Sequence, residues 1–487
     1  MKNSKFENYG CFPEDLLAPV IKRQEDPERD EKLREKARKL EETLKSFGFD
    51  AHVMNMVQGP AFSRFDLTFD GPAKVAKIKA LEDDLDFCKA LGVYSIRVEA
   101  PVPGKSCIGI ETLNEKLEEV TLRELIETED YKISSPLTVP IGKDVEGNLI
   151  YGDLTKMGHL LIAGTTGSGK SICICSFLTG ILLHSSPEDV KMILVDTKII
   201  ELSVYNGLPH LLLPVINEPK KALSALAWAI SEKERRLKLF EEERVENIDE
   251  YNAKHKDDPE GEHLPLILFM IDEFEPLMSV AKEETETLIS RLVPYAADAG
   301  INLLIATQIP SLNVISSVIS NNIGSRIAFA VWSAVSSKVI LHEKGAEKLR
   351  GMGDMLYAPI SAMNPLRVQG VYISDEEVET VCGYFRNRYG AMYDEAVTEA
   401  IDKGSFIFES TIVKALEPDE LYRKAVKLVI SKQRASISEI QRVLDIGYPK
   451  AARLIDRLEK EGVIGPFDSG NPRKVLITDE EWQKRNK

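Results

Sequence analysis

The spacing of hydrophobic positions changes along the chain, and each change marks a different kind of secondary structure. Between residues 31 and 48 the apolar side chains recur every three or four positions, which predicts an amphipathic helix ending near Gly48. Strand-like alternation follows in AHVMNMVQGP, SRFDLTFDG and YSIRVEAPV, with another helix predicted over residues 75–91. Residues 31–135 therefore predict a small α+β domain, and residues 1–30 predict a loosely held polar tail.

From residue 136 to residue 410 the pattern consists of continuous apolar runs separated by helical stretches. The runs are HLLIAG, KMILVDT, LPLILFMIDE, INLLIATQ and SRIAFAV. Buried parallel strands have unbroken apolar sequences because helices cover both faces of their sheet. This segment therefore predicts an α/β domain with a doubly wound sheet.

Residues 416–487 predict a third module. Ser436–Glu439 has the sequence of a capping box that opens a short helix, and Asp445–Gly447 that of a turn. Residues 448–462 predict a second helix, and GVIGPFDSGNPRKVLI predicts two short strands around a turn. A helix-turn-helix followed by a β-wing is a winged helix.

The amino-acid composition indicates a folded globular protein and argues against a disordered one. The chain has 487 residues, of which 43% are hydrophobic and 29% charged, as in a globular protein of several domains. Its net charge of −16 argues against a coat of positive charge, and only the terminal module is locally basic, with 15 Lys and Arg against 12 Asp and Glu.

Cysteine usage and hydropathy give an expectation for location. The six cysteines lack disulfide or metal-ligand spacing, which favours reduced thiols in the cytoplasm. The start of the chain has no apolar core of a signal peptide, and the most apolar stretch, residues 160–183, is interrupted by Lys170 and four glycines. We therefore expect no membrane segment.

The strongest chemical signal is GTTGSGKS, which lies between a predicted strand and a predicted helix and fits the pattern G-x-x-x-x-G-K-S. In such a loop the glycines let successive backbone amides face a phosphate. Lys170 is expected to reach the β- and γ-phosphates of ATP, and the Ser171 hydroxyl to bind Mg²⁺. The predicted nucleotide-binding residues are Gly164, Thr165, Thr166, Gly167, Ser168, Gly169, Lys170 and Ser171.

The ends of other predicted strands supply candidate catalytic groups. LPLILFMIDEF ends in a carboxylate pair, of which Asp272 is expected to hold Mg²⁺ through water and Glu273 to polarise the attacking water. Gln308 follows INLLIAT and is expected to sense the γ-phosphate, or else to form an ordinary strand-end hydrogen bond. Asp196 and Lys198 lie at the same sheet edge, where they either shape the site or bind across an interface.

The winged helix carries the candidate DNA contacts. Arg453 is expected to pair with guanine in the major groove, with Lys450 and Arg457 on the same helix. Arg434, Arg473 and Lys474 are expected to meet phosphates. The alternative is a winged helix that contacts protein.

Together these motifs resemble the FtsK/SpoIIIE family of DNA translocases over most of the chain. The similar segments, in family order, include PGKSCIGIE, MGHLLIAGTTGSGKS, LFMIDEFEPLM, AGINLLIATQIPS, GMGDMLY and ASISEIQRVLDIGYPKAARLIDRLEKEGVIGP. The resemblance implies a RecA-like motor that forms a homo-hexameric ring around double-stranded DNA. It also implies γ winged helices that read guanine-rich sites, and a site-specific recombinase or cell-division protein as a further partner.

The chain departs from the family pattern at several positions. The family's D-P-K is Asp196-Thr197-Lys198 here, and the Arg of A-T-Q-R-P-S is Ile309. A family Arg that is thought to reach the neighbouring subunit's nucleotide is Ala297, which leaves Arg326 as the candidate to supply that charge.

A family loop that faces DNA has Ala334 and Lys338 here, so Lys338 is the remaining candidate contact. The family's membrane spans and long linker have no counterpart in this sequence, so we do not expect septum anchoring.

These observations favour an ATP-driven translocase of double-stranded DNA that serves chromosome segregation or DNA transfer. One alternative is an ATP-binding, DNA-associated accessory subunit with weak motor activity, which Ala297, Ile309 and Ala334 motivate. Another is a coupling ATPase for conjugation or packaging, against which the γ-like module argues.

Overall fold

A computed structural model of the chain divides into two compact units, residues 1–403 and residues 404–487. We describe each unit by itself. The residues that the structure describes are 6, 9, 13–20, 27–69, 75–93, 95–102, 104–198, 201–256, 261–404, 418–432, 434–436, 440, 448–465, 473–478 and 482.

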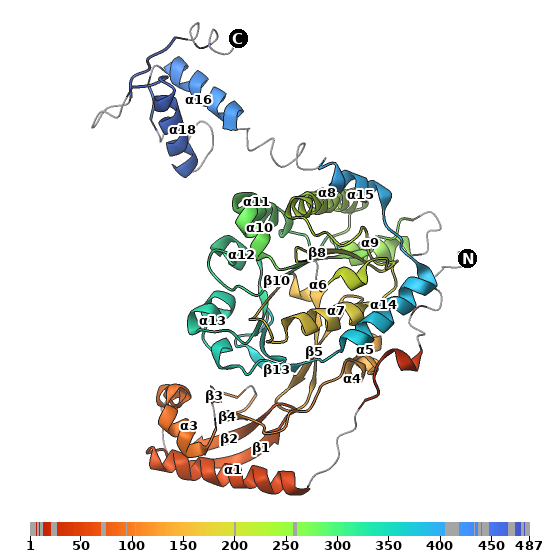
Figure 1. Cartoon of the computed structure of the whole chain (residues 1–487), viewed down its shortest axis with the longest axis vertical. Helices are drawn as coiled ribbons and strands as arrows, with labels where there is room; N and C mark the ends of the chain where they lie inside the picture. Colours follow the sequence, from red (N-terminus) through yellow and green to blue (C-terminus); the bar gives the residue numbers. More distant parts are fainter. Residues whose placement is uncertain are drawn as a thin grey trace. The chain divides into compact units, whose positions relative to one another are not determined.

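The first unit begins with a small α+β module, which we call the N-terminal module (residues 27–113; Figure 1). Its antiparallel sheet has the order β1-β2-β4-β3, and α1 buries Leu40 and Leu44 against it, as the helical spacing predicts. The strands are β1 (Ala51–Gln58), β2 (Phe62–Phe69), β3 (Ile96–Glu99) and β4 (Ile108–Leu113). The helices are α1 (Pro27–Ser46), α2 (Val75–Lys79) and α3 (Leu85–Leu91).

The rest of the first unit, which we call the central domain (residues 121–403), is built on a nine-stranded sheet of order β6-β5-β13-β12-β11-β7-β10-β9-β8. The strands from β11 to β8 in this order are parallel, and the remaining pairs are antiparallel. The α/β fold predicted from the apolar runs is confirmed. The antiparallel part was not predicted, because its strands carry no comparable run of apolar residues.

The strands of the central domain have the following bounds: β5 (Thr138–Asp144), β6 (Leu149–Asp153), β7 (Leu160–Ala163), β8 (Val190–Asp196), β9 (Leu266–Asp272), β10 (Ile301–Thr307), β11 (Ser325–Phe329), β12 (Asp354–Ala358) and β13 (Leu366–Gly370). In β9 and β10 every residue is buried. Both strands therefore lie in the middle of the core, where their carboxyl ends have fixed positions.

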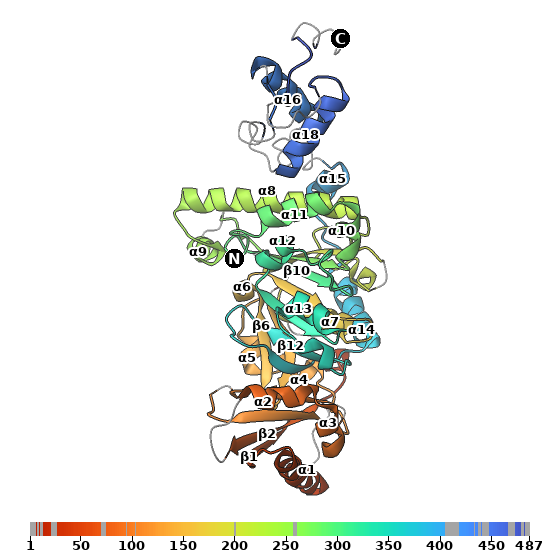
Figure 2. The same cartoon turned by 90° about the vertical axis from the view of Figure 1, so that its left-hand side faces the viewer.

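Helices flank this sheet, with α7 and α14 on one side and α12 on the other (Figure 1), while α8 and α11 lie side by side (Figure 2). The helices of the central domain are α4 (Leu122–Ile126), α5 (Glu129–Lys132), α6 (Leu154–Met157), α7 (Lys170–His184), α8 (Pro219–Glu243), α9 (Ile248–His255), α10 (Glu275–Val280), α11 (Lys282–Leu292), α12 (Ser317–Asn322), α13 (Ala334–Leu341), α14 (Asp375–Tyr389) and α15 (Glu395–Asp402).

The described residues near the start of the chain pack against the central domain, whereas the sequence predicted a loosely held tail. The Tyr9 hydroxyl donates to the carbonyl of Leu182 at 2.8 Å, and the Tyr9 ring stacks on Phe385 with centroids 5.3 Å apart. Leu16 and Leu17 join the core of the central domain. The physical reason is that a few apolar side chains, spaced through a polar segment, pack against apolar residues far away in the sequence. A local hydrophobic pattern does not reveal such contacts.

Buried ion pairs join the N-terminal module to the central domain. Arg367 of β13 pairs with Asp354 of β12 at 2.8 Å and with Glu111 of β4 at 3.2 Å, and Glu111 also pairs with Arg97. Burial disfavours the guanidinium, but the two carboxylates outweigh burial and raise the pKa of Arg367 above its usual value. This cluster therefore fixes the two sheets against each other.

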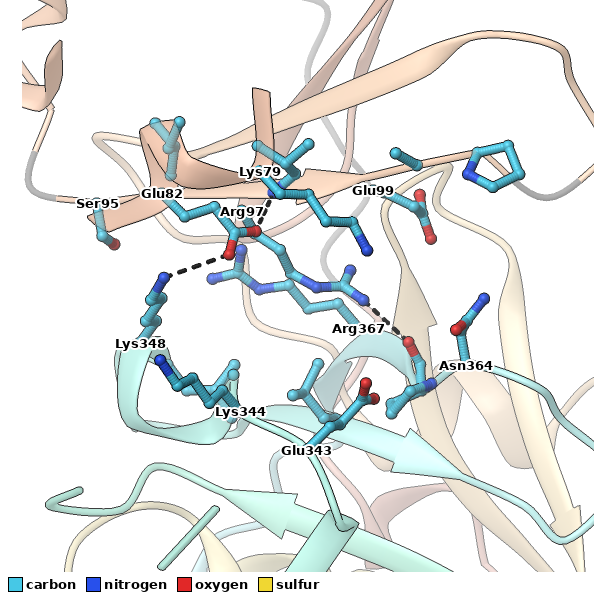
Figure 3. A pocket seen from close by; sticks show the side chains of 18 residues that line it. Lys79, Glu82, Ser95, Arg97, Glu99, Glu343, Lys344, Lys348, Asn364 and Arg367 are labelled. Carbon is cyan, nitrogen blue, oxygen red and sulfur yellow. Dashed lines mark hydrogen bonds and ion pairs between the residues drawn. The ribbon is translucent and has the colours of Figure 1, made fainter. Parts of the chain in front are cut away.

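A pocket opens beside these ion pairs, between the two parts of the first unit (Figure 3). Lys348 of the central domain reaches Glu82 of the N-terminal module at 3.3 Å across it. Arg97 spans the same gap and donates to the carbonyl of Pro365 at 3.0 Å. Polar contacts therefore continue along the contact between the two parts.

The second unit contains α16 (Pro418–Lys432) and α18 (Tyr448–Lys460) around a core of its own. An isolated antiparallel bridge between Ile464 and Val475 lies where the wing was predicted, and another joins Arg473 of the same segment to Ala435. Of the first predicted helix and the turn, residues 437–439 and 441–447 lie outside the described residues.

We expect Arg367→Ala to lower stability by about 3–5 kcal/mol, because it leaves the buried carboxylate of Asp354 without its ion pair and leaves Glu111 with Arg97 alone. Differential scanning calorimetry of the whole chain measures the loss. The control is Lys403→Ala, which removes an exposed ion pair with Glu399 and should cost less than about 1 kcal/mol. Equal shifts in Tm for the two variants would contradict this role of Arg367.

Candidate functional site

The glycine-rich loop connects β7 to α7 at the centre of the sheet, with β10 and β11 on either side of β7. Gly167 and Gly169 have φ angles of 76° and 111°, in the left-handed region that favours glycine. A Cβ on Gly164 would lie 2.5 Å from the Cβ of Phe329 and 2.7 Å from Oγ of Ser168. The loop therefore needs its three glycines to turn tightly between the strand and the helix.

The neighbouring strands hold this loop in place. The Gly164 amide donates to the last carbonyl of β10 at 3.3 Å, and the Thr165 amide and hydroxyl both donate to the carbonyl of Ala330, at 3.0 and 2.9 Å. The Thr166 hydroxyl donates to Oε1 of Gln308 at 2.8 Å. The structure thus brings Gln308 against the loop, and its role at the γ-phosphate stays a prediction.

A buried charge cluster lies beneath the loop. Nζ of Lys170 is 2.6 Å from Oδ1 of Asp272 and 3.4 Å from Oε1 of Glu273, and all three residues are buried. Burial disfavours the ammonium group, but Asp272 and then Glu273 outweigh it, so the pKa of Lys170 is raised. The cluster therefore places one ammonium group beside two carboxylates at one strand end.

This arrangement fits a bound phosphate chain and its cation. Ser168 Oγ and Glu273 Oε1 are buried and have no hydrogen-bond partner among the described residues. The N-terminus of α7 begins at Lys170 and favours an anion. The hydroxyl of Ser171 and the carboxylate of Asp272 are oxygen ligands of the kind that Mg²⁺ prefers.

Sequence reasoning missed Glu201, which lies close to the same cluster. Burial raises the pKa of Glu201, as do the charges of Asp272 and Glu273, while a hydrogen bond from Ser171 opposes the shift. Asp196 shapes the connecting turn, because its carboxylate accepts from the amides of Lys198 and Glu201, each at 3.0 Å. The available signal was a second carboxylate soon after Asp196.

Arg326 lies away from solvent and is held by main-chain groups. Its guanidinium donates to the carbonyls of Ile340 at 2.7 Å, Ser320 at 2.6 Å and Ile323 at 3.2 Å, and burial lowers its pKa. Arg326 therefore ties the segment around α12 to the end of α13. The catalytic role that the sequence suggested for it stays a prediction that the geometry does not support.

The predicted DNA contacts fall into groups. Lys338, Arg434 and Lys474 are exposed. Arg457 pairs with Glu461 at 2.8 Å and lies over the Tyr422 ring, and Arg473 pairs with Glu459. Lys450 and Arg453 lie on α18, but their side chains are outside the described residues.

Apolar side chains are exposed in the loops after β10 and β11. Ile309 is 50% exposed after β10, and Ala334 begins α13. Trp332, which the sequence reasoning did not single out, is 90% exposed two residues before Ala334.

The strand, glycine loop and helix, together with the carboxylates at the end of a nearby parallel strand, define a RecA-like P-loop ATPase fold. A solved structure of similar fold is the pCW3 conjugation coupling protein TcpA with ATPγS, with a TM-score of 0.50 and 22% identity over 72% of this chain and 99% of that one. At this identity the likeness shows the fold alone.

Family comparisons identify the chain more closely. Residues 121–312 match the FtsK/SpoIIIE family, residues 12–114 the FtsK alpha domain and residues 417–478 the FtsK gamma domain. The chain therefore belongs to the FtsK/SpoIIIE family, as the sequence motifs predicted.

Two relatives illustrate the match. The DNA translocase FtsK of Caldanaerobacter subterraneus subsp. tengcongensis is 48% identical over 94% of this chain and 63% of its own length. The DNA translocase SpoIIIE of Bacillus subtilis is 44% identical over 92% of this chain and 57% of its own length. The chain thus spans about 60% of the length of these curated relatives.

No helix within the described ranges combines the length and the apolar composition that crossing a membrane requires.

We expect Gly164→Ala to weaken nucleotide binding by about tenfold, because the new methyl group would overpack the loop against Phe329 and Ser168. Isothermal titration with ATPγS measures the change in Kd. The matched control is Gly383→Ala in α14, where an added Cβ meets no atom within 4 Å. Unchanged affinity in the Gly164 variant would contradict the assignment of the loop.

Proposed function

We propose that the chain hydrolyses ATP and uses the energy to move double-stranded DNA. The observation that carries this proposal is the buried cluster of Lys170, Asp272 and Glu273 under a glycine-rich loop, in a chain of the FtsK/SpoIIIE family. Both relatives described above are named DNA translocases.

The loop residues divide the work of holding ATP. The loop from Gly164 to Ser171 encloses the phosphates, and Lys170 compensates their charge. Ser171 and Asp272 hold Mg²⁺, with Asp272 acting through water. Mg²⁺ held there would supply positive charge beside the phosphate oxygens.

Two residues act on the reaction itself. Glu273 polarises the attacking water, since its buried Oε1 atom has no hydrogen-bond partner among the described residues and is the oxygen of this carboxylate that pairs with Lys170. Gln308 links the phosphate loop to β10 through Thr166, which supports its role in coupling nucleotide state to motion.

The match to the FtsK gamma domain supports sequence reading by the second unit. Arg434, Lys450, Arg453, Arg457, Arg473, Lys474 and, in the central domain, Lys338 are the proposed DNA contacts. A homo-hexameric ring, a recombinase or cell-division partner and a cytoplasmic location complete the proposal.

We expect long duplex DNA to stimulate steady-state ATP turnover by the whole chain, and both Lys170→Ala and Glu273→Ala to abolish the stimulated rate. A coupled-enzyme assay with and without DNA measures it. Nucleotide binding without DNA-stimulated turnover would instead favour the accessory-subunit alternative. Unchanged turnover in the Lys170 variant would overturn the site assignment.

Removing residues 404–487 should leave DNA-stimulated turnover but abolish preference for a DNA sequence, because the second unit has a core of its own. Competition binding with guanine-rich and scrambled duplexes measures the preference. If the truncated chain still discriminates between them, the sequence is read elsewhere.

A further inference from the structure

The backbone of Glu273 is in a conformation that residues other than glycine rarely adopt. Its φ angle is 57°, in the left-handed region. The residue on either side of the bend is held by a neighbouring strand: the Phe274 amide donates to the carbonyl of Ala306 in β10 at 2.9 Å, and β9 pairs with β8 as far as Asp272. Contacts from both sides therefore fix where the Glu273 side chain begins.

One of these contacts comes from the turn after β8. The Thr197 hydroxyl donates to the carbonyl of Glu273 at 3.3 Å. The Thr197 hydroxyl is the donor, so this hydrogen bond is lost in Thr197→Val, which has a similar shape but no hydroxyl.

The Glu273 carboxylate lies between two lysines, one near each oxygen. Its Oε2 atom is 3.3 Å from Nζ of Lys198, whereas its Oε1 atom is 3.4 Å from Nζ of Lys170. Oε1 is buried without a hydrogen-bond partner among the described residues. With Oε2 held by Lys198, the carboxylate presents Oε1 toward the phosphate loop.

We propose that Thr197 and Lys198 are positioning residues for Glu273. Thr197 stabilises the strained backbone of Glu273. Lys198 holds Oε2, so that Oε1 is placed to accept a hydrogen bond, and then the proton, from the attacking water. This inference rests on the proposed ATP hydrolysis and adds two residues to it. A general base needs such an orienting partner, because a small misplacement of its acceptor atom costs much of its effect.

The test compares Lys198→Met with Lys198→Arg, and Thr197→Val with Thr197→Ser, in the whole chain. We expect Lys198→Met to lower kcat about tenfold, as a part of the roughly 10²–10⁴-fold effect of a positioned base. KM for ATP and the Kd of ATPγS, measured by calorimetry, should stay within about twofold. Lys198→Arg and Thr197→Ser should restore most of kcat, and Thr197→Val should lower it less than Lys198→Met.

Two controls separate positioning from a general loss of charge. Lys221→Met removes a lysine of similar exposure, 41% against 45%, whose partner Asp402 lies 2.8 Å away on the surface. It should leave kcat unchanged. In a Glu273→Gln background, Lys198→Met should lower the residual rate no further, because both changes act on one group.

Several results would overturn the inference. An unchanged or raised kcat in Lys198→Met would mean that Lys198 does not orient the base. Loss of ATPγS binding in the same variant would mean that Lys198 acts on the nucleotide. Turnover that depends on Glu273 but not on Lys198 refutes this inference alone, whereas no turnover in the unaltered chain refutes the proposed function and this inference with it.

Discussion

The attraction between Lys170 and the two carboxylates at the end of β9 is the constraint on which the site depends. A buried ammonium group without a partner would be costly, and so would two adjacent buried carboxylates. At 2.6 Å from Asp272 and 3.4 Å from Glu273, Lys170 satisfies both needs. The first residue of α7, Lys170, must therefore lie within reach of the end of β9. The strand order β7-β10-β9 brings these two points close together.

The same groups that stabilise the structure are those the proposed chemistry requires. Lys198, which is half-exposed and lies outside the buried cluster, is the second lysine that pairs with Glu273. The Thr197–Glu273 hydrogen bond acts on the backbone at the same point. Substitutions of Thr197 or Lys198 in the turn after β8 therefore affect Glu273, which directly follows β9.

The ion pairs between the N-terminal module and the central domain reach close to the phosphate loop. Asp354, which pairs with Arg367, follows Gly353, and the Gly353 amide donates to the carbonyl of Ser168 at 2.9 Å. Gly169 also packs against Gly353, since a Cβ on Gly169 would lie 2.6 Å from the Gly353 nitrogen. The loop, the β12 segment and the N-terminal module thus form one continuous set of contacts.

The sequence by itself determined the parts whose signal is local. The glycine loop between a strand and a helix, the carboxylates after β9 and the amphipathic α1 follow from short-range spacing, and the resemblance of the ordered motifs indicates the family. Only the tertiary structure decided which side chains meet: Lys170 and Asp272, 102 residues apart, the burial of Arg326, the docking of Tyr9 and the place of Glu201. The reason is physical. Periodicity fixes which face of an element is apolar, but strand order and packing decide which distant residues share an environment.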